Sequence, residues 1–496
     1  MPSQLLATKS IADLHEADSG AHDLRRVLGP IHLTLLGIGG IIGAGIFVLT
    51  GTAAADHAGP ALVLSFVVAG LGCTFAGICY SEFAAMIPVS GSAYSYSYAT
   101  LGEGVAWFIG WNLVLEYLFA VATVSTAWSG YVLSLLDQFH IHIPDALSHA
   151  PLDQGKTPLD IVSTGAILNI PAVAIVVAIA TICYIGIKQS STFNAVIVAI
   201  KVAVVVMFIV IGIGYVQPAN WHPFIPPNTG QFGHYGWSGV IGGAGVIFFA
   251  YIGFDAVSTA AQETRNPPRD MPIGILTSLV ICTVLYIVVS AVLTGMVSYT
   301  KLSVAAPVAF AIDQYPSLRW LGLPVKIGAI AGLTSVMLVM TIAQARIFLA
   351  MARDGLLWPF FGRVHPRFRT PSTATAITGF FAALIGGLFP VRLLGELVSI
   401  GTLAAFVTVC LGVLVLRKTR PDLPRPFRTP APWFICPVGA LVCLGMMLGL
   451  GEATWARLII WSLIGLIIYI FYGYRHSRLR ATNERLAQRR ADGEAA

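Results

Sequence analysis

Charged residues are scarce in this 496-residue chain. Asp, Glu, Lys and Arg together make up 10% of it, whereas hydrophobic residues make up 56% and the mean hydropathy is +0.80. An ordinary soluble globular protein contains about 25% charged residues, so this composition excludes that class. We therefore expect a polytopic membrane protein.

The sequence also lacks the motifs of common enzymes. It has no His-Glu-x-x-His pair, no clustered Ser, His and Asp, and no phosphate-binding loop for ATP. The seven cysteines lie singly in apolar runs, so they predict neither a metal site nor a disulfide framework. We expect no enzymatic activity, no cofactor and no nucleic-acid partner, and active transport would have to draw on an ion gradient.

Apolar segments long enough to cross a bilayer recur along the chain. We predict about twelve spans, near 31–55, 60–86, 104–136, 167–185, 191–215, 237–262, 271–297, 322–353, 371–388, 391–416, 434–452 and 455–477. The connection 301–318 is long enough for a short helix outside the membrane. The first 29 residues are polar and contain no short apolar core, so no signal peptide is expected.

Basic residues are unevenly distributed between the connections. If the first span runs from inside to outside, six Lys or Arg lie outside, Lys201 lies within a span, and 22 of the 29 lie inside. This positive-inside bias predicts an inner or plasma membrane protein with both termini in the cytoplasm. The basic run from Arg475 to Arg490 is interpreted as a topology anchor, with binding to anionic lipid as the alternative.

Glycine is abundant inside the first span. Five glycines fall within nine residues between Gly37 and Gly45. Each costs a helix about 1 kcal/mol relative to alanine, so we predict a break near Gly43 to Gly45. Backbone groups freed within a membrane must be satisfied by protein or by a polar cavity, and we interpret this break as the ligand site.

A second glycine-rich segment opens the sixth span, from Gly239 to Gly245, and continues to Asp255. Two such segments at corresponding positions indicate inverted repeats with a binding site at mid-membrane. The alternative is that the glycines only let helices approach closely. The predicted organisation is an N-terminal tail at 1–30, a first repeat at 31–216, a second repeat at 237–416, two additional spans at 434–477 and a basic tail at 478–496.

The backbone N–H and carbonyl groups freed at the two breaks could together bind an α-amino acid. N–H groups from Gly45 onward favour a carboxylate, and the carbonyls near Ile42 and Ala250 favour an ammonium group. Phe249, Ile252 and Met340 would select the side chain, although Phe249 could equally be an ordinary core aromatic. The predicted substrate-binding residues are Ile41, Ile42, Gly43, Ala44, Gly45, Phe249, Ala250, Ile252 and Met340.

Ionisable residues within the spans are functional candidates by default. Lys201 lies well inside the fifth span, where it cannot easily reach water, so we predict that it faces the bundle interior and exchanges a proton. The alternative, which is compatible, is that it caps carbonyls of a broken helix. Glu116 is a second candidate for proton coupling. Asp255 is expected to order the second break through local hydrogen bonds, and Glu82 is expected to be structural.

These residues resemble the amino acid–polyamine–organocation superfamily, and within it the bacterial relatives of the cationic amino acid transporters. The resemblance runs from about Leu28 to the last span. The segments that carry it are 37–51, 248–255, 263–274, 346–357 and 425–428. The resemblance implies an all-α leucine-transporter fold of about twelve helices with five-plus-five inverted repeats. It also implies uptake of an amino acid with a proton.

In that family a lysine of the fifth span lies between the first and eighth helices, where sodium-coupled relatives bind sodium. Lys201 matches it, with the carbonyls near Gly43 and the side chains of Thr334 and Ser335 as implied neighbours. Two departures bear on the substrate: Ala44 replaces a threonine found in many relatives, and Met340 replaces a smaller residue of the animal members. A longer side chain at 340 shortens the pocket, which favours small or neutral amino acids.

Three readings of the function stay open. The first is proton-coupled import of an amino acid by alternating access. The second is exchange of one amino acid or polyamine for another, which the same site would serve. The third is a receptor that binds an amino acid without moving it. Membrane lipid is an expected partner, while a small membrane subunit or a homodimer is left open.

Overall fold

The computed structural model describes residues 2–9, 28–87, 92–155, 157, 160–186 and 191–484. Over these residues the protein is mainly helical with almost no strand, and each of the twelve segments expected to span the membrane forms helix. This confirms the predicted all-α polytopic class. Most of the predicted N-terminal tail and the end of the basic tail, with Arg485, Arg489 and Arg490, lie outside the described residues.

The described residues of the first half form sixteen elements, in which η marks turns of 3-10 or π helix. They are α1 (Pro2–Leu5), α3 (Pro30–Ile41), η1 (Gly45–Leu49), α4 (Thr50–Ala53), η2 (Ala54–Ala58), η3 (Gly59–Ala61), α5 (Leu62–Met86), α6 (Ser92–Thr100), α7 (Glu103–Gln138), α8 (Asp145–Ser148), β1 (Leu152–Gln154), β2 (Ile161–Ser163), α9 (Ile170–Ile185), α10 (Ser191–Gly212), η4 (Ile213–Tyr215) and η5 (Pro218–Trp221).

The second half continues in the same way. It contains α11 (Gly236–Ile247), η6 (Phe248–Tyr251), η7 (Asp255–Glu263), α12 (Pro267–Met296), η8 (Tyr299–Lys301), α13 (Pro307–Asp313), η9 (Pro316–Leu318), α14 (Arg319–Arg353), η10 (Pro359–Gly362), α15 (Ser372–Leu388), α16 (Val391–Thr419), α17 (Pro432–Gly449), α18 (Glu452–Ile468), η11 (Tyr469–Gly473) and α19 (Tyr474–His476).

Length and hydropathy agree with a membrane bundle. Within the described ranges, nine helical stretches are long and apolar enough to cross a bilayer, and α3, α9 and α15 are shorter apolar helices. α3 is short because the chain leaves the helix at Ile42. The first and second predicted spans are joined without a loop, since η2 and η3 carry the helix through the expected connection and turn at Gly59.

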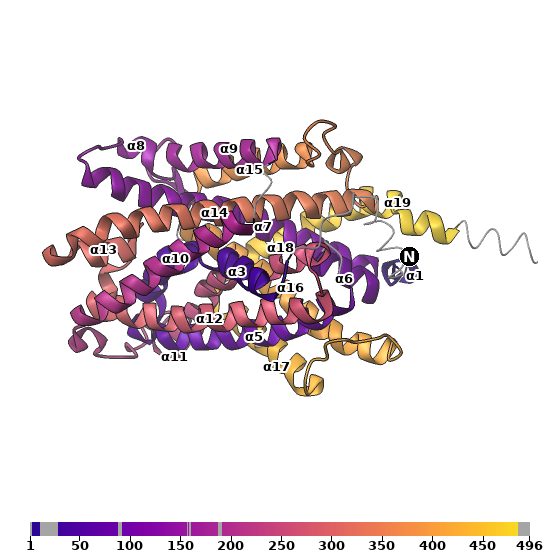
Figure 1. Cartoon of the computed structure of the whole chain (residues 1–496), viewed down its shortest axis with the longest axis horizontal. Helices are drawn as coiled ribbons and strands as arrows, with labels where there is room; N and C mark the ends of the chain where they lie inside the picture. The colour runs from indigo at the N-terminus through magenta and orange to yellow at the C-terminus, as the bar shows by residue number, and fades with distance from the viewer. Residues whose placement is uncertain are drawn as a thin grey trace, which may run out of the picture.

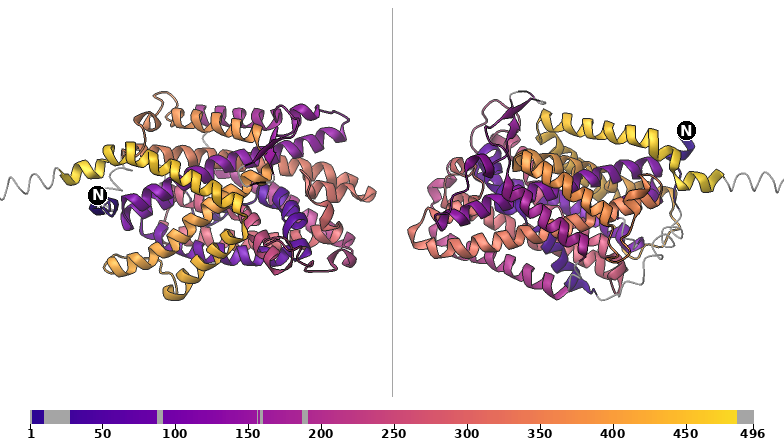
Figure 2. Two further views of the ribbon diagram at one scale, coloured as in Figure 1. Left: turned by 180° about the vertical axis from the view of Figure 1, so that it is seen from behind. Right: turned by 90° about the horizontal axis from the view of Figure 1, so that it is seen from above.

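The long helices run along one common direction (Figure 1). α1 and α19 lie at one end of the bundle, which we call the terminal face, and α8 and α13 lie at the other, the opposite face (Figures 1 and 2). α13 is the short helix predicted in the connection 301–318. The sequence did not predict α6, nor the antiparallel hairpin in which Leu152 pairs with Ser163 and Gln154 with Ile161.

α7 forms the centre of the packing, between α14 and α16, and α5 packs along α12. α3 contacts α12, α10 and α14. The first interrupted helix is therefore surrounded by other helices, which is the setting that irregular backbone requires at this depth.

Candidate functional site

Two helices are interrupted in the middle of the bundle. α3 ends at Ile41, Ile42 is extended with φ −71° and ψ 99°, and helix resumes from Ala44. In the second, η6 ends at Tyr251, and Gly253 has a φ of +118° before η7 begins at Asp255. A φ in that range is one that glycine adopts readily and other residues do not. The first break begins at Ile42, one residue before the predicted interval of Gly43 to Gly45. The second break lies at the end of the predicted segment from Gly239 to Asp255.

The two interrupted helices touch each other through backbone. A Cβ atom added to Gly45 would lie 2.2 Å from the Cα of Ala250, and one added to Gly253 would lie 2.7 Å from the carbonyl of Gly40. Neither position has room for a side chain. Close packing, considered from sequence as an alternative role for the glycines, thus operates at Gly40, Gly45 and Gly253 beside the breaks themselves.

Lys201 is fully buried on α10 and reaches the end of α3. Its Nζ donates hydrogen bonds to the carbonyls of Gly39, at 2.7 Å, and Ile42, at 3.1 Å. The carbonyls at the C-terminal end of a helix carry partial negative charge, so they stabilise an ammonium group. Among the described residues Lys201 has no carboxylate partner. The charge of this side chain therefore depends on the first break.

Tyr286 of α12 bridges the two breaks, and sequence reasoning missed it. Its hydroxyl lies 2.9 Å from the carbonyl of Ile41 and 3.0 Å from that of Ala250, and it can donate to either. The only sequence signal was a tyrosine within an apolar span. The carbonyls of Ile41 and Ile42, predicted to bind a substrate ammonium, thus already accept from Tyr286 and Lys201. Each carbonyl oxygen has a second lone pair available.

α14 presents one face to the first break. A Cβ on Gly332 would lie 3.2 Å from the Cγ of Lys201, and a Cβ on Gly43 would lie 3.1 Å from a methyl group of Val336. Met340 is one turn beyond Val336, and residues four apart share a helix face. Met340, which is 1% exposed, therefore lies on the same face of α14 as Val336.

The other predicted residues of α14 have their own partners. The Thr334 hydroxyl donates to the carbonyl of Ile330 and accepts a hydrogen bond of 3.1 Å from the Trp128 indole of α7. The Ser335 hydroxyl donates to the carbonyl of Gly332. Gly332 of α14 packs against the stem of Lys201.

The remaining substrate-binding candidates lie at the breaks. Ala44, Phe249, Ala250 and Ile252 are all at least 95% buried. A cavity of about 10 Å³ lies beside the first break, lined by residues that include Ile46, Phe47 and Phe208. That volume is at the lower limit for one water molecule, so this cavity has no room for an amino acid.

Asp255 is fully buried and orders the second break. One of its carboxylate oxygens accepts a hydrogen bond of 3.2 Å from the N–H of Gly253, which is the local contact expected from the sequence. The other accepts from the hydroxyl of Tyr117 on α7. Tyr117 therefore ties the second interrupted helix to the centre of the bundle.

Glu116, the neighbour of Tyr117, is 1% exposed, and neither of its carboxylate oxygens has a hydrogen-bond partner among the described residues. Asn112, one turn earlier on α7, and Ser399 and Thr402 on α16 also have unpartnered polar atoms within that part of the chain. An unpaired buried charge is costly. Glu116 thus requires a proton, a water molecule or a partner that moves.

Contacts close the bundle on both sides of the breaks. Towards the opposite face, Tyr131 donates a hydrogen bond of 2.8 Å to the carbonyl of Phe47, and a Cβ on Gly51 would lie 2.6 Å from Pro307 of α13. Towards the terminal face, Leu28 forms an isolated parallel β-bridge with Thr264, directly after η7, and Arg346 lies 3.7 Å from the Glu263 carboxylate.

Comparison with known proteins fits this architecture. Residues 28–472 match the family described as Amino acid permease. The methylthioribose transporter of Bacillus subtilis is 47% identical over 96% of this chain and 99% of its own length. The branched-chain amino acid permease of the same species is 48% identical over 97% and 100%.

A plant protein is similar over a smaller share of its length. The vacuolar cationic amino acid transporter 4 of Arabidopsis thaliana is 37% identical over 85% of this chain and 68% of its own length. The family match covers both breaks, Lys201 and Met340. The chain belongs to the amino acid permease family of the amino acid–polyamine–organocation superfamily.

Proposed function

We propose that this protein is a secondary active transporter that imports a small or neutral amino acid together with protons by alternating access. The observation that carries the proposal is the pair of hydrogen bonds from Lys201 Nζ to the carbonyls of Gly39 and Ile42. A protonatable group is thereby coupled to the backbone that would bind the substrate.

The backbone around the first break supports recognition of an amino acid. The first turn of a helix leaves its N–H groups without intrahelical partners, and helix resumes there at Ala44, so those N–H groups suit a carboxylate. The free lone pairs of the Ile41 and Ala250 carbonyls suit an ammonium group. Ala44 contributes no hydroxyl, and Met340 limits the length of the substrate side chain.

Lys201 would act through its charge. A protonated Nζ donates to Gly39 and Ile42 and holds α3 in its present position. Loss of the proton weakens both hydrogen bonds, because a charged donor binds roughly twice as strongly as a neutral one. α3 is then freer to move away from α10. Glu116, buried without a partner, is the second site at which we propose that a proton is exchanged.

Alternating access requires that one of the two closed sides opens at a time. On the opposite face the contacts of Tyr131 and α13 would separate. On the terminal face the contacts of Leu28 and Arg346 with η7 would separate. We propose that the terminal face is cytoplasmic in the cell membrane, because most of the basic residues belong to that side.

Uptake by proteoliposomes tests the proposal. In liposomes that contain the purified protein, an inward proton gradient should drive accumulation of a labelled small amino acid, and a protonophore should abolish it. We expect Lys201→Ala to lose gradient-driven accumulation by about tenfold or more, since two charge-assisted hydrogen bonds are removed. Lys301→Ala, at an exposed lysine of η8, is the matched control.

Two results would reject parts of this scheme. Uptake in Lys201→Ala that still responds fully to the proton gradient would remove the coupling role of Lys201. Influx that depends strictly on an internal amino acid would favour the exchanger, and stoichiometric binding without any influx would favour the receptor.

A second class of substrate should be tested in the same assay. The relative named as a methylthioribose transporter matches this chain about as well as the branched-chain permease does. Methylthioribose carries neither a carboxylate nor an ammonium group, so it would not use the polarity of the first break. Competition by methylthioribose with no competition by amino acids would replace the proposed substrate.

A further inference from the structure

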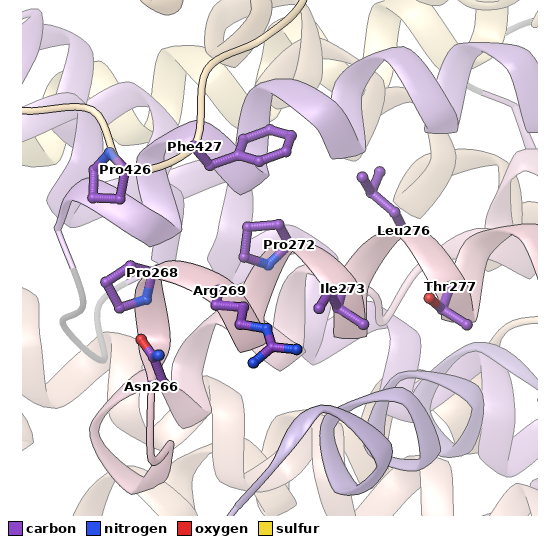
Figure 3. A pocket seen from close by; sticks show the side chains of 9 residues that line it. All are labelled: Asn266, Pro268, Arg269, Pro272, Ile273, Leu276, Thr277, Pro426 and Phe427. Atoms are coloured by element: carbon purple, nitrogen blue, oxygen red, sulfur yellow. The ribbon is translucent and has the colours of Figure 1, made fainter.

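A pocket of about 660 Å³ opens on the side of the bundle near the terminal face. Its lining includes Arg269, Pro272, Ile273 and Leu276 of α12, and Pro426 and Phe427 of the connection between α16 and α17. Figure 3 shows Pro426 and Phe427 on a loop opposite the α12 side chains. The volume is typical of a site for a small organic ligand.

The loop wall of the pocket is held in place by a buried carboxylate. Glu82 of α5 is 1% exposed and accepts hydrogen bonds from Arg417 Nη2, at 2.7 Å, and from the N–H of Thr429, at 2.7 Å. Its other oxygen lies 3.4 Å from Arg425 Nε. These contacts fix both ends of the loop that carries Pro426 and Phe427. The loop wall of the pocket is therefore held in a defined position. The contacts also fit the structural role expected of Glu82 from the sequence.

The pocket contains one basic side chain that can bind an anion. Arg269 is exposed, and within the described part of the chain its side chain makes no hydrogen bond or ion pair. Arg417 and Arg425, in contrast, are engaged with Glu82. Asp270 is buried and is not part of the lining. An anion entering the pocket would therefore meet one uncommitted guanidinium group, which suits a phosphate.

The apolar part of the pocket continues into the outer surface of α12. Ile273 is 39% exposed, Val280 is 55% exposed and Val284 is 57% exposed. Their spacing, with that of Thr277, places them on one helix face, one to four turns beyond Arg269. In a bundle that crosses a bilayer, this exposed apolar face borders the acyl chains. The pocket thus joins a cationic group near the membrane boundary to a lipid-facing surface.

We propose that this pocket binds one anionic phospholipid, with its phosphate at Arg269 and the start of an acyl chain against Ile273, Leu276 and Phe427. The charge complementarity and the continuity with the lipid-facing side of α12 select this occupant over a soluble anion or an uncharged lipid. Basic pockets between helices near the membrane boundary are suited to such headgroups.

Binding of phosphatidylglycerol to the full-length protein in an uncharged detergent tests the proposal. Native mass spectrometry and thermal melting would follow the titration, and neither measurement depends on transport. We expect Arg269→Ala to weaken binding by about fivefold, since one basic residue near the surface is worth about 1 kcal/mol. Arg363→Ala, at an exposed arginine near η10, should leave binding unchanged.

A second variant separates the pocket from general surface charge. Leu276→Trp fills the apolar part of the pocket and keeps Arg269, so it should also weaken binding; melting without lipid checks that each variant is folded. Equal binding by Arg269→Ala and the unmodified protein would overturn the proposal. So would an equal effect of phosphatidylcholine, or saturation of the melting shift by inorganic phosphate alone.

Discussion

Single residues at the centre of the bundle satisfy backbone groups that a broken helix leaves open. Lys201 of α10 donates hydrogen bonds to the carbonyls of Gly39 and Ile42, and Tyr286 of α12 donates to that of Ile41. A carbonyl buried without a partner costs about 1–3 kcal/mol. These side chains therefore stabilise a break that apolar neighbours alone could not.

Tyr286→Phe should destabilise the protein, because it removes the hydroxyl shared by the carbonyls of Ile41 and Ala250. We expect a loss of about 1–2 kcal/mol in the free energy of unfolding, seen as a lower melting temperature of the purified protein. Tyr299→Phe is the control, since that hydroxyl makes no hydrogen bond to the described residues. Unchanged melting in Tyr286→Phe would contradict the bridging role.

Met340→Ser should widen the range of accepted substrates towards cationic amino acids, because it shortens a side chain on the α14 face beside the first break. The measurement is competition by arginine and lysine for uptake of a labelled neutral amino acid. Met351→Ser provides the comparison, since Met351 is a buried methionine of α14 packed near Gly110. If the two variants show the same substrate profile as the unmodified protein, Met340 does not limit the pocket.

At the level of elements, the two interrupted helices depend on close backbone contact. Gly45 and Ala250, and Gly40 and Gly253, meet at distances that exclude a side chain on the glycine. The breaks and the contacts lie within a few residues of each other. Any movement of α3 relative to η6 therefore changes the packing and the hydrogen bonds of both breaks together.

Gly45→Ala should separate η1 from η6. The added Cβ would lie 2.2 Å from the Cα of Ala250, so backbone must shift, at a cost of about 1–3 kcal/mol. We expect a lower melting temperature and impaired uptake. Gly445→Ala on α17 is matched to it, because a Cβ there meets nothing within 4 Å and alanine favours the helix. A Gly45→Ala protein as stable and active as Gly445→Ala would show that the contact is dispensable.

At the scale of the whole molecule, the terminal face is held together by another buried carboxylate, that of Glu103. Glu103 at the start of α7 is fully buried and accepts from the hydroxyls of Tyr98 and Tyr469, both at 2.8 Å. It also accepts from Gln4 and from the hydroxyl of Ser477. Segments from both ends of the chain thus converge on one side chain.

Glu103→Ala should loosen both ends of the chain at once. Four donors lose their acceptor, so we expect a loss of at least about 2 kcal/mol in the free energy of unfolding and faster proteolysis near residues 2–9 and 477–484. Glu452→Ala, at an exposed glutamate that begins α18, should change neither property. Equal proteolysis of the two variants would argue against a shared anchor.

The sequence alone determined the class of the molecule, the twelve helical segments, and where two of them break. Hydropathy and glycine content act locally, so they can be read from neighbouring residues. The depth of Lys201 and the local role of Asp255 at Gly253 followed from the same kind of reasoning. The inverted repeats, the substrate and the proton coupling stay predictions.

Only the tertiary structure decided which groups meet. Tyr286 lies 245 residues beyond Ile41, and Glu82 lies 335 residues before Arg417. No local pattern encodes such pairs, because packing of distant helices selects the partner of a buried polar group. For the same reason neither the packing of Gly332 against the stem of Lys201 nor the pocket beside Arg269 could be foreseen. Composition thus specified which buried polar groups need partners, and the packing of distant helices specified which residues supply them.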